Sequence, residues 1–122
     1  MIDRWMESYI AAWRSDDPAA VAALFSQDAH YYTTPYRPPK TGRDEIARWW
    51  VGQQDSKIDW TFEYTVLVDG DVSVVRGITF YPATAEDPKA RTYHNLWTIR
   101  MQPDGRASEF VEFWMRQPDE AA

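Results

Sequence analysis

The sequence predicts an α+β domain in which N-terminal helices cover one face of an antiparallel sheet. Three observations support this prediction. Apolar residues recur at helical spacing before residue 54, they alternate with a period of two from Lys57 onwards, and two Asp-Gly turns interrupt the second half. The 122 residues contain no linker or internal repeat, so residues 1–122 are expected to form one domain.

The first half of the chain is predicted to be mainly helical. One apolar face runs along the first helix and contains Ile2, Trp5, Met6, Tyr9, Ile10 and Trp13. Asp17 and Pro18 favour the start of a second helix, because Asp caps helix N-termini and Pro suits the first turn. Residues 28–34 are predicted to form a short strand.

A loop with three prolines follows at residues 35–40, where helix and central strand are excluded. Thr41–Asp44 resembles a capping box, and a third helix is expected to follow it.

The second half is predicted to be an antiparallel meander of four strands. Residues 57–68 alternate apolar and polar side chains, which indicates a strand with one buried face. A turn at Asp69-Gly70 leads into a return strand at 72–81. Two further strands are expected at 91–101 and 107–116, joined by a Pro-Asp-Gly turn.

Polar residues interrupt three of the predicted apolar strand faces. Arg76 shares its face with four apolar residues of strand 72–81, Asn95 lies beside Trp97, and Glu112 lies between Phe110 and Trp114. Because an unpaired buried charge is costly, we expect Arg76 and Glu112 to face the interior together, in contact directly or through one water. A structural network and a functional site are both compatible with this pattern.

Composition and charge exclude several classes of partner and chemistry. A formal net charge of −6 disfavours nucleic-acid and anionic-membrane binding, and the absence of cysteine excludes thiolate chemistry. His30 and His94 have no carboxylate at ligand spacing, and no Gly-rich phosphate loop occurs, so no metal or cofactor is expected. No signal peptide or membrane span is visible, which favours a cytoplasmic location.

The faces opposite the predicted interior are also apolar, and no helix remains to cover them. These positions are Val75, Tyr81, Val111, Phe113 and Met115. A contiguous exposed apolar patch usually marks an interface, so we expect a homodimer formed through the outer sheet face.

The order of elements and several local segments resemble the nuclear transport factor 2-like superfamily, and more closely its SnoaL-like (polyketide cyclase-like) branch. The matching segments are YIAAW at 9–13, DPAAVAALF at 17–25, GRDEI at 42–46 and DGRASEFVEFW at 104–114. The resemblance implies a cone-shaped, cystatin-like α+β roll, in which the sheet wraps a deep pocket that the helices close. Many members form dimers through the outer sheet face.

Residues that match enzymes of this superfamily do so only in part. Tyr9 matches the helix-1 tyrosine of ketosteroid isomerases, but Thr34 stands at the position of their general base and Trp97 near that of their second oxyanion donor. The resemblance therefore argues against steroid isomerisation.

Limonene epoxide hydrolases and polyketide cyclases give a closer match. Compared with the limonene epoxide hydrolases, Arg76 matches their arginine and Glu112 matches their second acid, whereas Ile78 stands in place of their first acid. The SnoaL-like cyclases rely on an acidic residue within the cone, and Glu112 is the candidate for that role.

Two functions follow as alternatives, and a protein-interaction module is a third. The first is binding of a flat apolar or aromatic small molecule in a pocket lined by Trp13, Tyr32, Thr34, Asn95, Trp97 and Trp114. The second is a cofactor-independent cyclase, isomerase, dehydratase or epoxide-hydrolase-like enzyme. In that enzyme Glu112 would act as acid or base, with Arg76 as its charged partner and Tyr9 or Asn95 stabilising the oxyanion.

Overall fold

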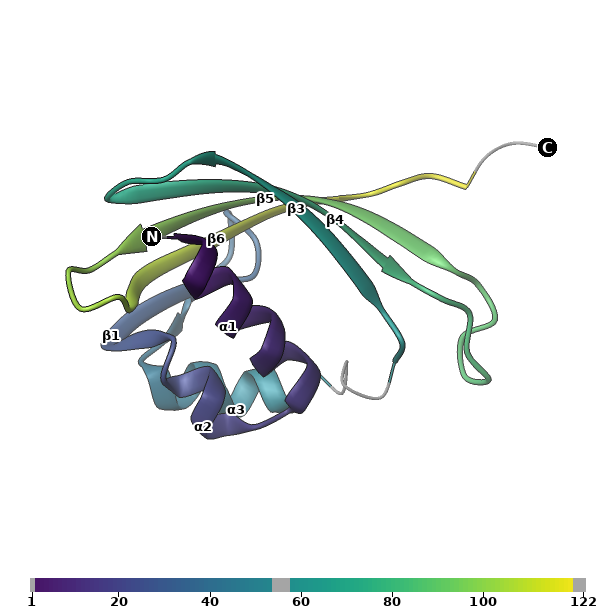
Figure 1. Ribbon diagram of the computed structural model, residues 1–122. Helices are drawn as coiled ribbons and strands as arrows, with labels where there is room; N and C mark the ends of the chain where they lie inside the picture. Colours follow the sequence, from purple (N-terminus) through teal and green to yellow (C-terminus); the bar gives the residue numbers. More distant parts are fainter. Residues whose placement is uncertain (1, 54–57, 120–122) are drawn as a thin grey trace.

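A curved sheet arches over three helices in the computed structural model, which describes residues 2–53 and 58–119 (Figure 1). The helices are α1 (Ile2–Ser15), α2 (Pro18–Ala22) and α3 (Arg43–Val51). The strands are β1 (Phe25–Tyr32), β2 (Lys40–Thr41), β3 (Thr61–Val68), β4 (Val72–Tyr81), β5 (Arg91–Met101) and β6 (Ala107–Arg116). The predicted α+β class is therefore confirmed.

The sheet of the described residues has the order β2-β1-β6-β5-β4-β3. Strands β3 to β6 form the predicted antiparallel meander, and β5 and β6 have the predicted bounds. Strand β1 begins and ends earlier than predicted and runs parallel to β6. The three prolines precede β2, which lies at the edge of the sheet. The predicted change of period at Lys57 lies outside the described residues.

The helix termini follow the sequence closely. The side chain of Asp17 accepts a hydrogen bond from the Ala19 N–H at 3.0 Å, as expected of an N-cap. The predicted capping box is displaced by one residue, because Gly42 caps α3 without a side-chain bond. Glu45 at N3 accepts a hydrogen bond at 2.5 Å from the N–H of Thr41, the residue before the N-cap, so the contact differs from that of a capping box.

The core is a cluster of aromatic rings between α1 and the concave face of the sheet. Phe110 of β6 is fully buried and stacks in parallel on Tyr9 of α1, with ring centroids 5.5 Å apart, and on Tyr31 of β1, at 4.6 Å. Trp5 and Trp97 contact the same ring. Helix α1 is therefore held to the sheet mainly by aromatic contacts.

The orientation predicted for β4 is wrong. Ser73, Val75 and Thr79 are buried on the inner face, whereas Arg76 is exposed on the outer face. Both alternating rows of this strand contain apolar residues, and the smaller row faces inward because aromatic rings from β3 and β5 occupy the space above it. Arg76 therefore does not meet Glu112 in the interior, and Val75 and Tyr81 do not belong to the outer surface.

Gly77 on the inner face of β4 provides room for one of these rings. A Cβ atom at this position would lie 2.4 Å from Cε1 of Phe62, whose ring stacks on Trp97 with centroids 4.9 Å apart. The Phe62 ring would therefore have to move away from Trp97.

We expect Gly77→Ala to lower the free energy of unfolding by about 1–3 kcal/mol, the usual range for an overpacked interior. Urea denaturation followed by circular dichroism measures this change. Gly70→Ala is the matched control, because its Cβ would meet no atom closer than 4.0 Å. Equal stability of the two variants would contradict the steric role of Gly77.

Candidate functional site

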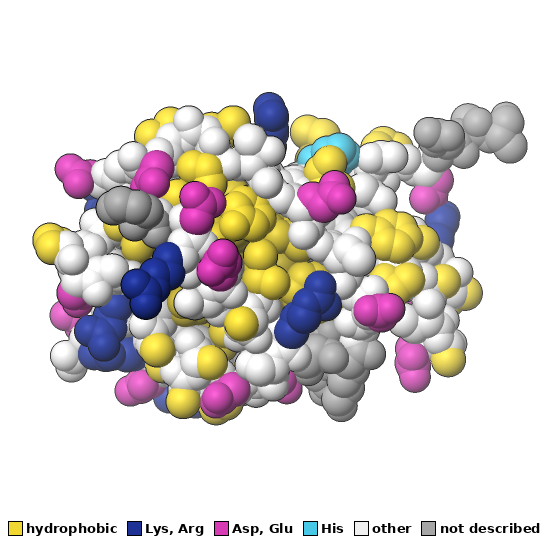
Figure 2. Space-filling view, in the orientation of Figure 1, with side chains coloured by type: hydrophobic (Ala, Val, Ile, Leu, Met, Phe, Trp, Pro, Cys, Tyr) yellow, Lys and Arg dark blue, Asp and Glu magenta, His cyan; other side chains and the backbone are white. Residues whose placement is uncertain are grey.

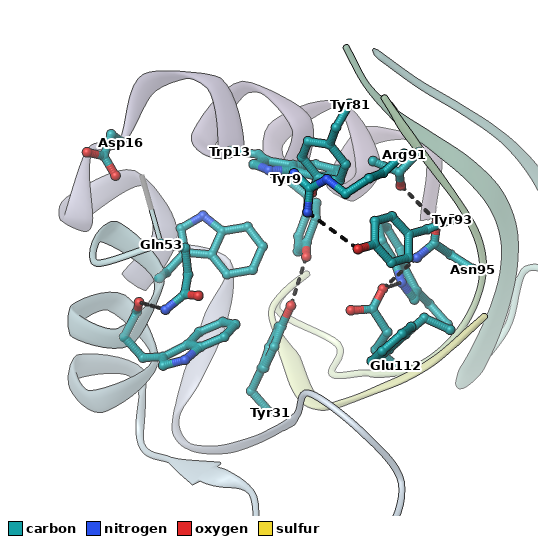
Figure 3. A pocket seen from close by; sticks show the side chains of 15 residues that line it. Tyr9, Trp13, Asp16, Tyr31, Gln53, Tyr81, Arg91, Tyr93, Asn95 and Glu112 are labelled. Atoms are coloured by element: carbon teal, nitrogen blue, oxygen red, sulfur yellow. Dashed lines mark hydrogen bonds between the residues drawn. The ribbon is translucent and has the colours of Figure 1, made fainter. Parts of the chain in front are cut away.

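A cavity of about 300 Å³ lies between the helices and the inner face of the sheet (Figure 3). Helices α1 and α3 provide one wall, and strands β4 to β6 provide the other. The lining residues are Tyr9, Trp13, Asp16, Tyr31, Trp49, Trp50, Gln53, Thr79, Tyr81, Arg91, Tyr93, Asn95, Trp97, Glu112 and Trp114. Its walls are therefore largely aromatic, with a few polar groups among the rings.

Glu112 lies in this cavity as the end of a hydrogen-bonded chain across three strands. Its Oε2 atom accepts hydrogen bonds from Asn95 Nδ2 at 2.8 Å and from Trp97 Nε1 at 2.7 Å. Thr79 Oγ1 donates to Asn95 Oδ1 at 2.8 Å, which orients the amide so that its nitrogen faces Glu112. Because both donors reach one oxygen, they fix the carboxyl group while its other oxygen faces the cavity (Figure 3).

Two tyrosine hydroxyls meet in the middle of the view in Figure 3, facing the Glu112 carboxyl group. The Tyr9 and Tyr31 oxygens are 3.0 Å apart and share a hydrogen bond that either can donate. Burial raises the pKa of Tyr9 well above its ordinary value of 10.0, and the negative charges of Tyr31 and Glu112 would raise this pKa further. Tyr9 is therefore a neutral phenol at physiological pH, able to donate a hydrogen bond.

The raised pKa of Tyr9 makes stability depend on pH. The folded protein holds this proton more tightly than the unfolded chain, so the free energy of unfolding falls as the pH rises above about 10. We expect Tyr9→Phe to remove this loss, which amounts to at most about 1.4 kcal/mol per pH unit for one proton.

Urea denaturation between pH 8 and pH 11 tests this expectation. Tyr36→Phe, which alters an exposed ring, should retain the pH dependence of the unmodified chain. Parallel pH profiles for Tyr9→Phe and the unmodified chain would show that Tyr9 ionises as easily in the folded state as in the unfolded state.

Most of the sequence-predicted site residues line the cavity, and three do not. Those in the cavity are Tyr9, Trp13, Asn95, Trp97, Glu112 and Trp114. Arg76 faces the outer side of the sheet. Its sequence match to the arginine of the epoxide hydrolases therefore does not place it in the cavity. Tyr32 and Thr34 are not part of the cavity wall, although Thr34 is buried.

The error at Tyr32 comes from the orientation of β1. This strand pairs with β6 in parallel and its register shifts between Phe25 and His30. Tyr31 is paired with Phe110 and therefore points inward with it, while His30 and Tyr32 point the other way. The small buried residue Ala29, two positions before Tyr31, is the sequence signal for this orientation.

Other residues of the cavity wall were missed from the sequence. Tyr81 and Arg91 are paired across β4 and β5, and both line the cavity with Tyr93. Trp49 and Trp50 of α3 complete the opposite wall. Tyr81 and Thr79 were missed because both faces of β4 contain apolar residues, so the sequence pattern does not show which face is the inner one.

Within residues 2–53 and 58–119, no group of three His, Asp or Glu side chains could hold a metal ion. His94 is exposed, and its Nε2 lies 2.8 Å from Gln117 Oε1. No helix of the described chain is long and apolar enough to cross a membrane.

The fold and the cavity define a class of small α+β domains in which a curved sheet closes over N-terminal helices. The sequence profile of the SnoaL-like domain family matches residues 6–110, and the chain belongs to this family. No curated protein matches the sequence significantly. The family predicted from the sequence is thus confirmed.

Solved structures show the same fold in other chains. One is described as the epoxide hydrolase/cyclase-like enzyme SalBIII, with a role in pyran ring formation in the polyether salinomycin. It superposes with a TM-score of 0.74 at 14% sequence identity, over 93% of this chain and 89% of that chain. In all, 284 chains are significantly similar, so the fold alone does not determine the function.

Proposed function

We propose that this domain binds a compact ring compound in the aromatic cavity. The supporting observation is the composition of the wall, because nine of the fifteen described lining residues are Trp or Tyr. Such rings stack on flat apolar ligands at little conformational cost. The volume of about 300 Å³ lies at the lower end of the range for small-molecule sites, which favours a ligand of one or two rings.

The polar groups in the wall restrict how such a ligand is oriented. The bonds from Asn95 and Trp97 hold Glu112 in place, and its carboxylate can accept a hydrogen bond from a ligand hydroxyl or amine. The Tyr9–Tyr31 pair can donate to a ligand oxygen. The favoured ligand is therefore apolar over most of its surface and carries an oxygen or nitrogen at the end that reaches Glu112.

Native mass spectrometry of the chain purified from its host tests this proposal. We expect an additional mass of a few hundred daltons at most, given the cavity volume, that is released on denaturation. Thr79→Phe would place a ring in the cavity and should eliminate the adduct. Thr65→Phe makes the same change on the exposed outer face of β3 and should retain it. An adduct retained by Thr79→Phe, or no adduct on the unmodified chain, would contradict the proposal.

Catalysis by Glu112 is the second candidate function, and the position of its carboxyl group favours it. The Asn95 and Trp97 donors fix a potential base in an aromatic cavity opposite two phenols. Glu112 would take a proton from the bound compound while Tyr9, a neutral phenol, donates a hydrogen bond to the oxygen on which charge develops. Such proton transfer needs no cofactor.

A homodimer through the outer sheet face is a further proposal. A groove of about 670 Å³ crosses this face and is lined by Arg76, Ile78, His94, Leu96, Phe113 and Met115, among others. Hydrophobic side chains also appear along the upper edge of the space-filling view, the outer side of the sheet (Figure 2). A second copy with the same strands would cover these residues on both subunits.

Sedimentation at high micromolar concentration should therefore give twice the chain mass. Leu96→Glu should give monomers, because it would bury a charge in the proposed interface. Lys40→Glu, on the short edge strand away from this face, is the control and should leave the dimer intact. A monomeric unmodified chain would contradict the proposal.

A further inference from the structure

Arg91 introduces a positive charge into the cavity wall at the start of β5. It is the first residue of β5 and pairs with Tyr81, the last residue of β4. It is the only basic residue among the described residues that line the cavity. Its position at the sheet end leaves the side chain partly exposed, with 27% of its surface accessible.

Two aromatic rings hold the guanidinium in place. Its Cζ lies 4.7 Å from the Tyr81 ring centroid and 5.9 Å from that of Tyr93, and its Nη1 donates to the Tyr93 hydroxyl at 3.4 Å. Tyr93 is two residues nearer Asn95 on the same strand, so the side chain folds back toward the interior (Figure 3). An arginine held in this way loses little conformational freedom when it binds a ligand.

Asp87 forms an ion pair with Arg91 but accepts no hydrogen bond from its Nε–H group. The Asp87 Oδ2 atom lies 3.4 Å from Arg91 Nε. The Nε–H group nevertheless forms no hydrogen bond with any described residue. Asp87 belongs to the loop after β4 and is not part of the cavity wall. The contact with Asp87 therefore involves Nε, whereas the terminal nitrogen Nη1 points to the Tyr93 hydroxyl in the cavity wall.

Arg91 and Glu112 contact different residues of β5. The guanidinium donates to the Tyr93 hydroxyl, whereas the Glu112 carboxylate accepts from Asn95 and Trp97. A ligand group bound to Arg91 would therefore lie at the part of the cavity wall formed by Tyr81 and Tyr93.

We propose that Arg91 binds a carboxylate of the ligand, so that the domain is specific for ring-containing carboxylic acids. This inference rests on the proposed function of the cavity and names its ligand class. A planar carboxylate matches the two nitrogens that a guanidinium presents on one edge. A phosphate dianion fits less well, because one arginine beside Asp87 leaves much of its charge uncompensated.

Isothermal titration with 2-naphthoate and 2-naphthamide tests the proposal on the unmodified chain. The two compounds have the same rings and nearly the same shape, and they differ in charge. We expect the acid to bind at least tenfold more tightly than the amide. Equal affinities would overturn the carboxylate assignment while leaving the proposed cavity function intact. Failure of both compounds to bind would overturn both.

Arg91→Gln should reduce the affinity for 2-naphthoate at least tenfold and change that for 2-naphthamide less than twofold. Arg106→Gln is the matched control, because Arg106 forms an ion pair of the same length, 3.4 Å, with Asp104 and is not in the cavity wall. It should retain the preference for the acid. A preference that persists in Arg91→Gln, or is lost equally in Arg106→Gln, would overturn the role of Arg91.

Discussion

Phe110→Ala is expected to lower the free energy of unfolding by about 3–5 kcal/mol, the range for removing a buried ring. Phe110 is fully buried and its ring stacks on Tyr9 and Tyr31. The alanine would leave a void between α1, β1 and β6, where this ring now stacks. A loss of this size approaches the total stability of many small domains, about 5–15 kcal/mol.

Urea denaturation gives the size of this effect. Phe110→Leu should lose less, because it retains part of the buried volume, and it remains measurable if the alanine variant does not fold. Tyr36→Ala removes a ring that is 74% exposed and should change the free energy of unfolding by less than about 0.5 kcal/mol. If the leucine variant were as stable as the unmodified chain, the stacked rings would not hold α1 to the sheet.

Replacing Glu112 separates its structural contribution from a chemical one. Glu112→Leu would leave the Asn95 amide and the Trp97 indole without their acceptor, and an unsatisfied buried donor costs about 1–3 kcal/mol. Glu112→Gln can place its amide oxygen where Oε2 lies and keep both bonds. We therefore expect the glutamine variant to be about as stable as the unmodified chain and the leucine variant to be clearly less stable.

The same pair of variants tests catalysis once the bound compound is known. If Glu112 transfers a proton, Glu112→Gln should lower turnover by about 10²–10⁴-fold while binding is largely retained. Turnover that falls only in proportion to the folded fraction would assign Glu112 a structural role. Asn95→Asp is less suitable for this comparison, because it would place a second carboxyl group against Glu112.

The sequence predicts the fold well because its two periodicities are distinct. Residues 107–116 place Glu112 correctly, since Phe110 on the same face is buried in the core and Trp114 lines the cavity. In β4 the alternation is present, but both rows are apolar, so the pattern does not distinguish the inner row from the outer. The requirement for Gly77 beneath the Phe62 ring settles the orientation, and that contact is visible only in three dimensions.

The place of Arg91 in the cavity wall was not predictable for a related reason. Arg91 lies next to a polar loop and, in sequence, is indistinguishable from a solvated charge. Its role at the cavity depends on pairing with Tyr81 and on stacking between two rings from neighbouring strands. Such cross-strand contacts arise from register, which the sequence pattern leaves open.

The indole N–H signals in a ¹⁵N–¹H correlation spectrum test the central claim, that a ring compound binds in this cavity, most directly. Five of the seven tryptophans line the cavity, whereas Trp5 and Trp60 do not. Trp5 is a suitable internal reference, because its Nε1 donates to the Leu24 carbonyl at 2.9 Å away from the cavity. On titration with 2-naphthamide, we expect the largest shifts at Trp50, Trp97 and Trp114 and little change at Trp5. Shifts confined to backbone amides of the outer face, such as those of Leu96 and Phe113, or no shifts at all, would contradict the claim.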